Sequence, residues 1–156
     1  MIQVIRNKAI KKALKKCGHQ YLSGDLEKNQ ELQYITDKKV NVGMGYHHFF
    51  ESEEAHYHTT CVEYQYVIKG TAKYFNIDRK EEIEVKKGDY FIIRENTRYT
   101  LKAKKGCQII FFKNPAINDK IILVSDEGEK KAIKNWQSSW KNKWNDVNAD
   151  TGNTGM

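Results

Sequence analysis

The sequence predicts an all-β protein whose antiparallel strands close into a jelly roll or barrel. Nine short runs, rich in β-branched and aromatic residues, follow one another at intervals of about 8 to 12 residues with turn residues between them. No segment of helix length separates these runs, and parallel pairing would require long crossovers. Closure of the sheet protects its edges. The single proline, Pro115, lies in a turn and interrupts no predicted strand.

The predicted strands lie between residues 31 and 125, the range we assign to the barrel. They are Glu31–Thr36, Val40–Phe50, Cys61–Lys69, Thr71–Ile77, Ile83–Lys86, Tyr90–Ile93, Tyr99–Ala103, Cys107–Phe112 and Ile121–Val124.

Residues 1–30 are predicted to form a short helix and a lead-in to the barrel. Ile10, Ala13, Leu14 and Cys17 recur with helical spacing, and Gly18 follows where a helix is expected to stop. The remainder of this range is polar and rich in turn residues.

Residues 126–145 are predicted to form a C-terminal amphipathic helix, followed by a flexible tail at 146–156. Ile133, Trp136, Trp140 and Trp144 recur on one helical face. This stripe is expected to pack on the barrel or on a second subunit, and the alternative is a basic helix that lies on a membrane or partner surface.

The composition indicates one water-soluble, folded domain. The chain has 156 residues, of which 39% are hydrophobic and 30% charged. Its longest apolar runs, Ile109–Phe112 and Ile121–Val124, are far shorter than the roughly 20 residues of a membrane span. The first residues lack a signal-peptide pattern, so we expect a cytoplasmic protein. Cys17, Cys61 and Cys107 are too few and too scattered for a disulfide framework and are expected to be reduced.

The basic charge gives little support for nucleic-acid binding. The formal net charge is +7, but only four of the 27 basic residues are arginines, the residue that grips bases and phosphates in two places. The lysines form no dense block. We expect them to cover a solvated surface, which can also attract anionic metabolites.

The main candidate for a functional site is the segment that contains His56, His58 and Glu63. Residues two apart on a strand face the same side, so the two imidazoles can reach one ion. After a turn near Thr59, the next strand can return Glu63 opposite them. Two imidazoles and one carboxylate leave positions on a metal open for a ligand. Alternatively, the three side chains only hydrogen-bond one another.

The segment reads H-x-H-x4-E-x6-G and ends at Gly70. On this chain's own composition, that pattern arises by chance in about one of a thousand such sequences. It resembles the first signature motif of the cupin superfamily at each of the four positions, as in single-domain cupins of the conserved-barrel type. The resemblance implies a double-stranded β-helix and a divalent metal (Fe, Mn, Zn or Ni) held by His56, His58 and Glu63.

The second cupin motif is only partly present. Gly88 fits it, but Arg94 stands at a proline position, Asn96 at a glycine position, and Ala103 at an asparagine position. Tyr99 stands where the family has its last metal-binding histidine. Strand alternation points Tyr99 inward. Its phenol can serve as a metal ligand, as a general acid or base, or as a pocket wall.

Two further residues are candidates for the site. His48 is predicted to share the inward face of the strand that begins at Val40, either as a catalytic group in the pocket or as a hydrogen-bonded core histidine, while His47 points outward. Gln65 shares a face with Glu63 and is expected to contact the substrate or a metal-bound water. Cys61 is interpreted as a packing residue, because nothing visible would lower its thiol pKa.

The resemblance to cupins leaves the reaction open. The leading hypothesis is a metal-dependent enzyme that isomerises, epimerises or eliminates on a small polar or anionic, sugar-derived metabolite, with Tyr99 or His48 moving the proton. One alternative is an Fe(II)-dependent dioxygenase. Another is a non-catalytic cupin that binds a small molecule. No nucleic-acid or membrane partner is expected, and a homodimer is plausible.

Overall fold

The computed structural model describes residues 1–141, which form two helices and eleven strands. Trp144 and the predicted tail at 146–156 lie outside the described residues. In chain order the elements are α1 (Asn7–Lys16), β1 (His19–Gly24), β2 (Ile35–Thr36), β3 (Asn41–Tyr46), β4 (Glu51–His58), β5 (Val62–Lys69), β6 (Thr71–Asn76), β7 (Glu81–Lys86), β8 (Tyr90–Ile93), β9 (Tyr99–Ala103), β10 (Gln108–Asn114), β11 (Lys120–Ile122) and α2 (Glu127–Gln137).

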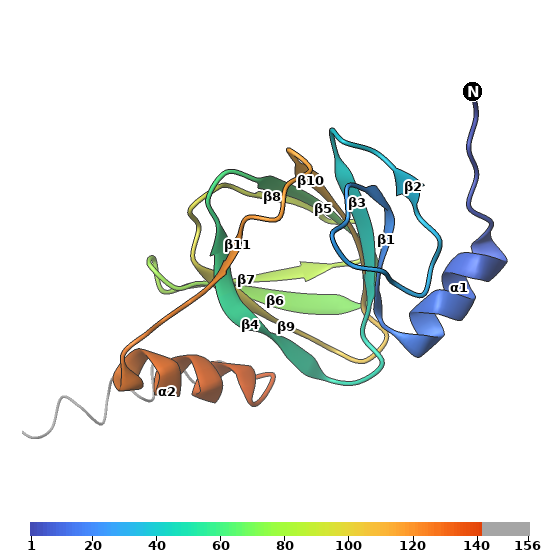
Figure 1. Ribbon diagram of the computed structural model, residues 1–156. Helices are drawn as coiled ribbons and strands as arrows, with labels where there is room; N and C mark the ends of the chain where they lie inside the picture. Colours follow the sequence, from blue (N-terminus) through green and yellow to red (C-terminus); the bar gives the residue numbers. More distant parts are fainter. Residues whose placement is uncertain (142–156) are drawn as a thin grey trace, which may run out of the picture.

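The strands form two sheets that face each other (Figure 1). One sheet has the order β2-β1-β3-β10-β5-β8, and the other has the order β11-β4-β9-β6-β7. Neighbouring strands in the described part of the chain pair antiparallel, except for the short parallel pair β1–β2. The arrangement confirms the predicted all-β jelly roll with a helix at each end of the chain. None of the helices among the described residues is long and apolar enough to span a membrane.

The space between the sheets holds an apolar core at one end and polar side chains at the other. Along β5 the side chains of Glu63, Gln65 and Val67 are buried in strict alternation, as expected for a strand with one face inside. The apolar core combines residues from both sheets, namely Val67, Ala72, Tyr74, Val85, Tyr99, Leu101, Ala103, Cys107 and Ile109.

A second core lies between α2 and the outer face of the sheet β11-β4-β9-β6-β7. In Figure 1 the helix runs beneath β4 and β9 of this sheet. Trp136 is completely buried there, with its ring centroid 5.3 Å from that of Phe75. Asp126 caps the helix by accepting a hydrogen bond of 2.8 Å from the backbone N–H of Glu129. Ile133 and Trp136 of the predicted stripe therefore pack on the barrel. The helix ends at Gln137, so Trp140 lies beyond it, and the predicted extent of 126–145 was too long for the described residues.

Lys102 departs from the expectation that the lysines cover a solvated surface. It is fully buried under α2, and its ammonium donates to the carbonyl oxygens of Trp136 and Ser139 at 2.6 and 2.7 Å. These carbonyls lie at the C-terminal end of the helix, where a cation is favourable.

Two strands were not predicted. β1 lies in the segment interpreted as a polar lead-in. The predicted strand Val40–Phe50 is in fact β3, which ends at Tyr46, and the chain then turns before β4 begins at Glu51. β4 reads ESEEAHYH and has no apolar alternation, because its inner face carries imidazoles.

The inward face of β3 was also predicted one residue out of register. Asn41 and Gly43 are the buried positions, whereas Val42 and Met44 are only half-buried. The phenyl ring of Phe111 occupies the space directly over Gly43, which a side chain at that position would fill. A glycine can thus mark the inner face of a strand when a neighbouring ring needs the room.

Candidate functional site

His56, His58 and Glu63 come together at the polar end of the barrel. The histidines project from the end of β4 and the glutamate from the start of β5, on the two opposite sheets. Their exposed fractions are 2%, 5% and 6%, and their ligand-capable atoms lie within 4.8 Å of one another. A shift of register between Glu53 and His56 places this end of β4 opposite Tyr99. Bulges of this kind re-aim side chains and are frequent beside functional sites.

Tyr99 faces this cluster, as strand alternation predicts. Its hydroxyl oxygen lies 2.8 Å from Oε1 of Glu63 and 3.0 Å from Nε2 of His56. Burial raises the pKa of the Tyr99 phenol well above its usual value, and the carboxylate of Glu63 raises it further. Tyr99 is therefore a neutral phenol that carries one proton into the site.

Hydrogen bonds to the outer nitrogen fix the orientation of both histidines. Nδ1 of His56 lies 2.8 Å from the carbonyl oxygen of Glu54, which can only accept, so Nδ1 carries the proton. Nδ1 of His58 lies 2.7 Å from Oδ1 of Asp119, a carboxylate that likewise accepts. In both neutral imidazoles the lone pair of Nε2 is therefore directed into the site.

The interior of the cluster consequently has more acceptors than protons. Nε2 of His58 lies 3.1 Å from Oε1 of Glu63, and the single phenolic proton of Tyr99 cannot serve both Glu63 and Nε2 of His56. Burial lowers the pKa of His56, which keeps that ring neutral. A cation is needed where these lone pairs converge.

A proton or a metal ion can supply that positive charge. Burial lowers the pKa of His58, but its bonds to Glu63 and Asp119 outweigh burial and raise the pKa overall. Burial raises the pKa of Glu63, yet the partnership with His58 holds it below its usual value, so Glu63 is a carboxylate. A second proton, on Nε2 of His58, would satisfy the Glu63 carboxylate. The same donor set suits a divalent metal.

Asp119 is a site residue that the sequence did not reveal. Besides His58, its carboxylate accepts hydrogen bonds of 2.7 Å from the backbone N–H groups of Thr60 and Cys61. These bonds hold the pKa of Asp119 well below its usual value, although burial opposes them. Asp119 therefore fixes both the turn between β4 and β5 and the tautomer of His58. Its distance along the chain from the histidines hides it from any motif of fixed spacing.

Gln65 lines the cavity, but both ends of its amide bind protein groups. Nε2 donates to Oε2 of Glu63 at 3.0 Å, and Oε1 accepts from the hydroxyl of Tyr74 at 2.7 Å. Gln65 and Tyr74 thus orient Glu63, and the predicted contact of Gln65 with substrate stays a prediction. The alternation along β5 contained the signal for Gln65, whereas Tyr74 looked like an ordinary core residue.

The structure does not bring His48 into the cluster. Because β3 ends at Tyr46, His48 falls in the following turn, and its Nε2 lies 2.8 Å from the carbonyl oxygen of Leu14 in α1. The prediction that it shares the inward face was wrong. His47, expected to point outward, lines the cavity and pairs with Glu51 at 2.8 Å.

Cys61 is fully buried beside the turn, and burial raises its thiol pKa to about 11. This agrees with its interpretation as a packing residue.

The cluster opens into a cavity of about 490 Å³, which is in the range of small-molecule sites. Its walls combine the polar cluster with aromatic and charged side chains of both sheets. The lining residues are Cys17, Gly18, His19, Tyr21, Gly45, Tyr46, His47, Glu51, Ser52, Glu53, His56, His58, Glu63, Gln65, Tyr74, Tyr99, Leu101, Ile109, Phe111, Lys113 and Lys120.

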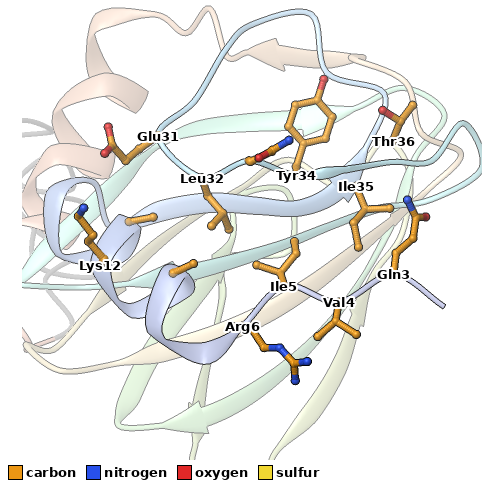
Figure 2. A pocket seen from close by; sticks show the side chains of 13 residues that line it. Gln3, Val4, Ile5, Arg6, Lys12, Glu31, Leu32, Tyr34, Ile35 and Thr36 are labelled. Carbon is orange, nitrogen blue, oxygen red and sulfur yellow. The ribbon is translucent and has the colours of Figure 1, made fainter.

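A larger cavity, of about 680 Å³, lies away from the histidines, between the N-terminal segment, α1 and residues 31–36 (Figure 2). Its walls carry Val4, Ile5, Leu32 and Ile35, with charged groups at the rim, and include no histidine or cysteine. By size alone, this cavity would be the preferred candidate for a ligand-binding site. The chemistry of the lining side chains instead favours the cavity of about 490 Å³ that contains His56 as the functional site.

Comparison with solved structures supports the double-stranded β-helix. A protein with such a domain from Klebsiella pneumoniae subsp. pneumoniae is 16% identical, with a TM-score of 0.50 over 57% of this chain and 78% of that one. A variant of PAC13 from Streptomyces, solved with uridine, is 15% identical, with a TM-score of 0.50 over 61% and 76%. KdgF from Halomonas sp. is 14% identical, with a TM-score of 0.50 over 65% and 80%. At these identities the likeness shows the fold.

The fold and the polar end of the barrel define a protein of the double-stranded β-helix class. A family model for the cupin domain matches residues 50–111, the segment that runs from β4 to β10 and includes the histidine cluster. This match confirms the resemblance of the segment to the cupin superfamily. No curated protein sequence matches it.

Proposed function

We propose that this cupin is a metal-dependent enzyme that acts on a small polar, sugar-derived or anionic metabolite by isomerisation, epimerisation or elimination next to a carbonyl. The observation that carries the proposal is that two imidazole lone pairs and one carboxylate converge inside the barrel. These acceptors outnumber the protons available to them. His56, His58 and Glu63 would hold a divalent metal, of which Fe, Mn, Zn and Ni suit this donor set.

The surroundings of the ligands support this assignment. Metal-binding histidines commonly donate their other N–H to a carbonyl or a carboxylate, as His56 does to Glu54 and His58 to Asp119. Gln65 similarly holds the second oxygen of Glu63. A metal bound there would polarise a substrate carbonyl as a Lewis acid.

Tyr99 is the proton donor in this proposal. Its buried phenol holds a proton at Oη, beside two of the three proposed ligands. A phenolate ligand would have to give up that proton, which burial and the charge of Glu63 oppose. His48 has no part in the reaction, since its ring nitrogen is bonded to α1.

The solved neighbours are compatible with a small polar ligand. PAC13 was solved with uridine, a molecule that carries a sugar, in a barrel of this fold. At this level of identity the comparison does not select a substrate, so the proposal depends on the side chains of this chain.

The first test is the metal content of purified protein, measured by inductively coupled plasma mass spectrometry. We expect about one divalent ion per chain in the wild type and almost none in His56→Ala. His48→Ala is the matched control, because it removes an imidazole outside the cavity. Equal metal content in the wild type and His56→Ala would contradict the assignment of the ligands.

The second test is turnover. Sugars, uronates and sugar phosphates in deuterium oxide are followed by NMR for exchange at the carbon next to the carbonyl. Exchange should require the metal, so a chelated preparation that keeps full turnover would disprove the mechanism.

Two histidines and a carboxylate also suit Fe(II) with positions open for oxygen, which keeps a dioxygenase as the second candidate. Oxygen consumption that depends on added iron and substrate would favour it. Tight binding in calorimetry without any transformation would instead favour a non-catalytic cupin.

A further inference from the structure

Lys113 is a cationic side chain inside the barrel, next to the candidate metal ligands. It lies on β10 in register with Glu63 on the neighbouring strand β5. Residues paired across strands leave the sheet on the same face, so both side chains point between the sheets. Lys113 is half-buried and lines the 490 Å³ cavity.

The ammonium of Lys113 has unused hydrogen-bonding capacity. It donates to the hydroxyl of Tyr21 at 2.9 Å, one bond for a group with three donors. Among residues 1–141 it forms no ion pair with a carboxylate. Lys120, the other lysine at this cavity, is already paired with Glu53 at 2.7 Å. Glu63 lies close enough to interact with the charge of Lys113 but forms no ion pair with it, so the remaining donors of the sheltered ammonium favour the binding of an anion.

Lys113 also stands where two cavities meet. Together with His19 and Tyr21 it lines both the cavity at the histidine cluster and a neighbouring one of about 360 Å³. The rings of His19, Tyr21 and Phe111 pack together there, with centroids 5.1 to 5.7 Å apart. A ligand that reaches from the cluster toward Lys113 therefore passes an aromatic face, against which the carbon face of a sugar ring can pack.

We propose that Lys113 and the hydroxyl of Tyr21 bind an oxyanion of the substrate, a carboxylate or a phosphate carried by a sugar-sized molecule whose other end lies at His56, His58 and Glu63. The position of that other end rests on the proposed function. The anion subsite itself depends only on Lys113 and its neighbours. Nothing in the cupin motif includes Lys113 or Tyr21, so the subsite belongs to this chain's own cavity.

The test is a calorimetric titration with three probes: D-glucuronate, D-glucose 6-phosphate and neutral D-glucose. Each is titrated into wild type, Lys113→Met, Lys113→Arg and Lys120→Met, with Mn²⁺ and after chelation. The first two probes separate a carboxylate from a phosphate. Lys120→Met is the matched control, because it removes the same charge from the same cavity where that charge is already neutralised.

We expect at least one anionic probe to bind wild type about 10-fold or more tightly than glucose, as a charge-assisted hydrogen bond allows. Lys113→Met should remove that preference, Lys113→Arg should keep most of it, and Lys120→Met should change it less than about threefold. Thermal unfolding checks that the methionine variant is folded, and the arginine variant tests the charge if it is not.

Several results would overturn the subsite: no preference for either anion in wild type, no measurable binding of either, or a preference that survives Lys113→Met. The chelated series separates this proposal from the proposed function. If Mn²⁺ fails to bind but Lys113 still determines anion preference, only the metal assignment fails. If Mn²⁺ binds and the preference is absent, only the subsite fails.

Discussion

Replacing Asp119 by asparagine should weaken metal binding by reversing the tautomer of His58. The asparagine oxygen is needed by the two backbone N–H groups of Thr60 and Cys61, which now donate to Oδ2 at 2.7 Å. Its amide NH₂ then faces Nδ1 of His58, which must become an acceptor. The ring proton moves to Nε2 and points at the site that a metal would occupy.

The size of the effect follows from the role of such outer partners. Their loss typically lowers metal affinity about 10- to 100-fold. At a metal concentration about 100 times the wild-type Kd, this removes roughly 1.3 to 2.3 kcal/mol of metal-linked stability. For a chain of this length the metal-induced rise in Tm should shrink by about 3 to 9 °C.

The assay is differential scanning fluorimetry of the chelated protein with Mn²⁺ or Zn²⁺ added back, supported by competition with a chelator. Asp89→Asn is the matched control, because Asp89 also accepts a backbone hydrogen bond in a turn, from the N–H of Lys86 at 2.8 Å, far from the histidines. An unchanged metal-induced shift in Asp119→Asn, with the variant folded, would refute the reasoning.

Four further predictions concern the packing of α2, the role of Tyr99, the reactivity of the cysteines and the oligomeric state. Trp136→Ala should destabilise the protein by about 3 to 5 kcal/mol, because it empties a fully buried site beneath the barrel; a loss below about 1 kcal/mol in urea unfolding would show that α2 adds little. Tyr99→Phe should retain metal but lower kcat about 100-fold or more, whereas loss of metal would make Tyr99 a ligand. Iodoacetamide at pH 8 should modify the exposed Cys17 alone, since burial raises the thiol pKa of Cys61 and Cys107 to about 11, and three rapid adducts by mass spectrometry would contradict this. Light scattering should report a homodimer, and a monomer at all concentrations would contradict this prediction.

The sequence predicted the parts of this fold that depend on local pattern. Turn residues and alternation located most strands, and the spacing of His56, His58 and Glu63 located the cluster, because all three lie on two strands joined by one turn. β4 was not predicted because its inner face holds the imidazoles of the site. A strand of this kind lacks the apolar alternation by which strands are recognised.

The groups that complete the site come from distant segments. Asp119 contacts His58 across 61 positions of sequence, and Tyr99 contacts His56 across 43. Alternation pointed Tyr99 inward but could not say what it would touch. The prediction for His48 was wrong because it assumed that the strand continued beyond Tyr46, where β3 ends. Contacts of this kind depend on how the two sheets face each other, which a single sequence encodes only through the complete fold.

The cluster lies across the seam between the two sheets. Glu63 belongs to one sheet, while His56, His58 and Tyr99 belong to the other. Every hydrogen bond that Glu63 makes with His58 or Tyr99 therefore ties the two sheets together at the polar end of the barrel. A divalent ion at this point would cross-link the two sheets at the polar end of the barrel. The amide hydrogens of β5 and β9 should therefore exchange with solvent more slowly when metal is bound. Loading the site and stiffening the entrance to the cavity would then be one event.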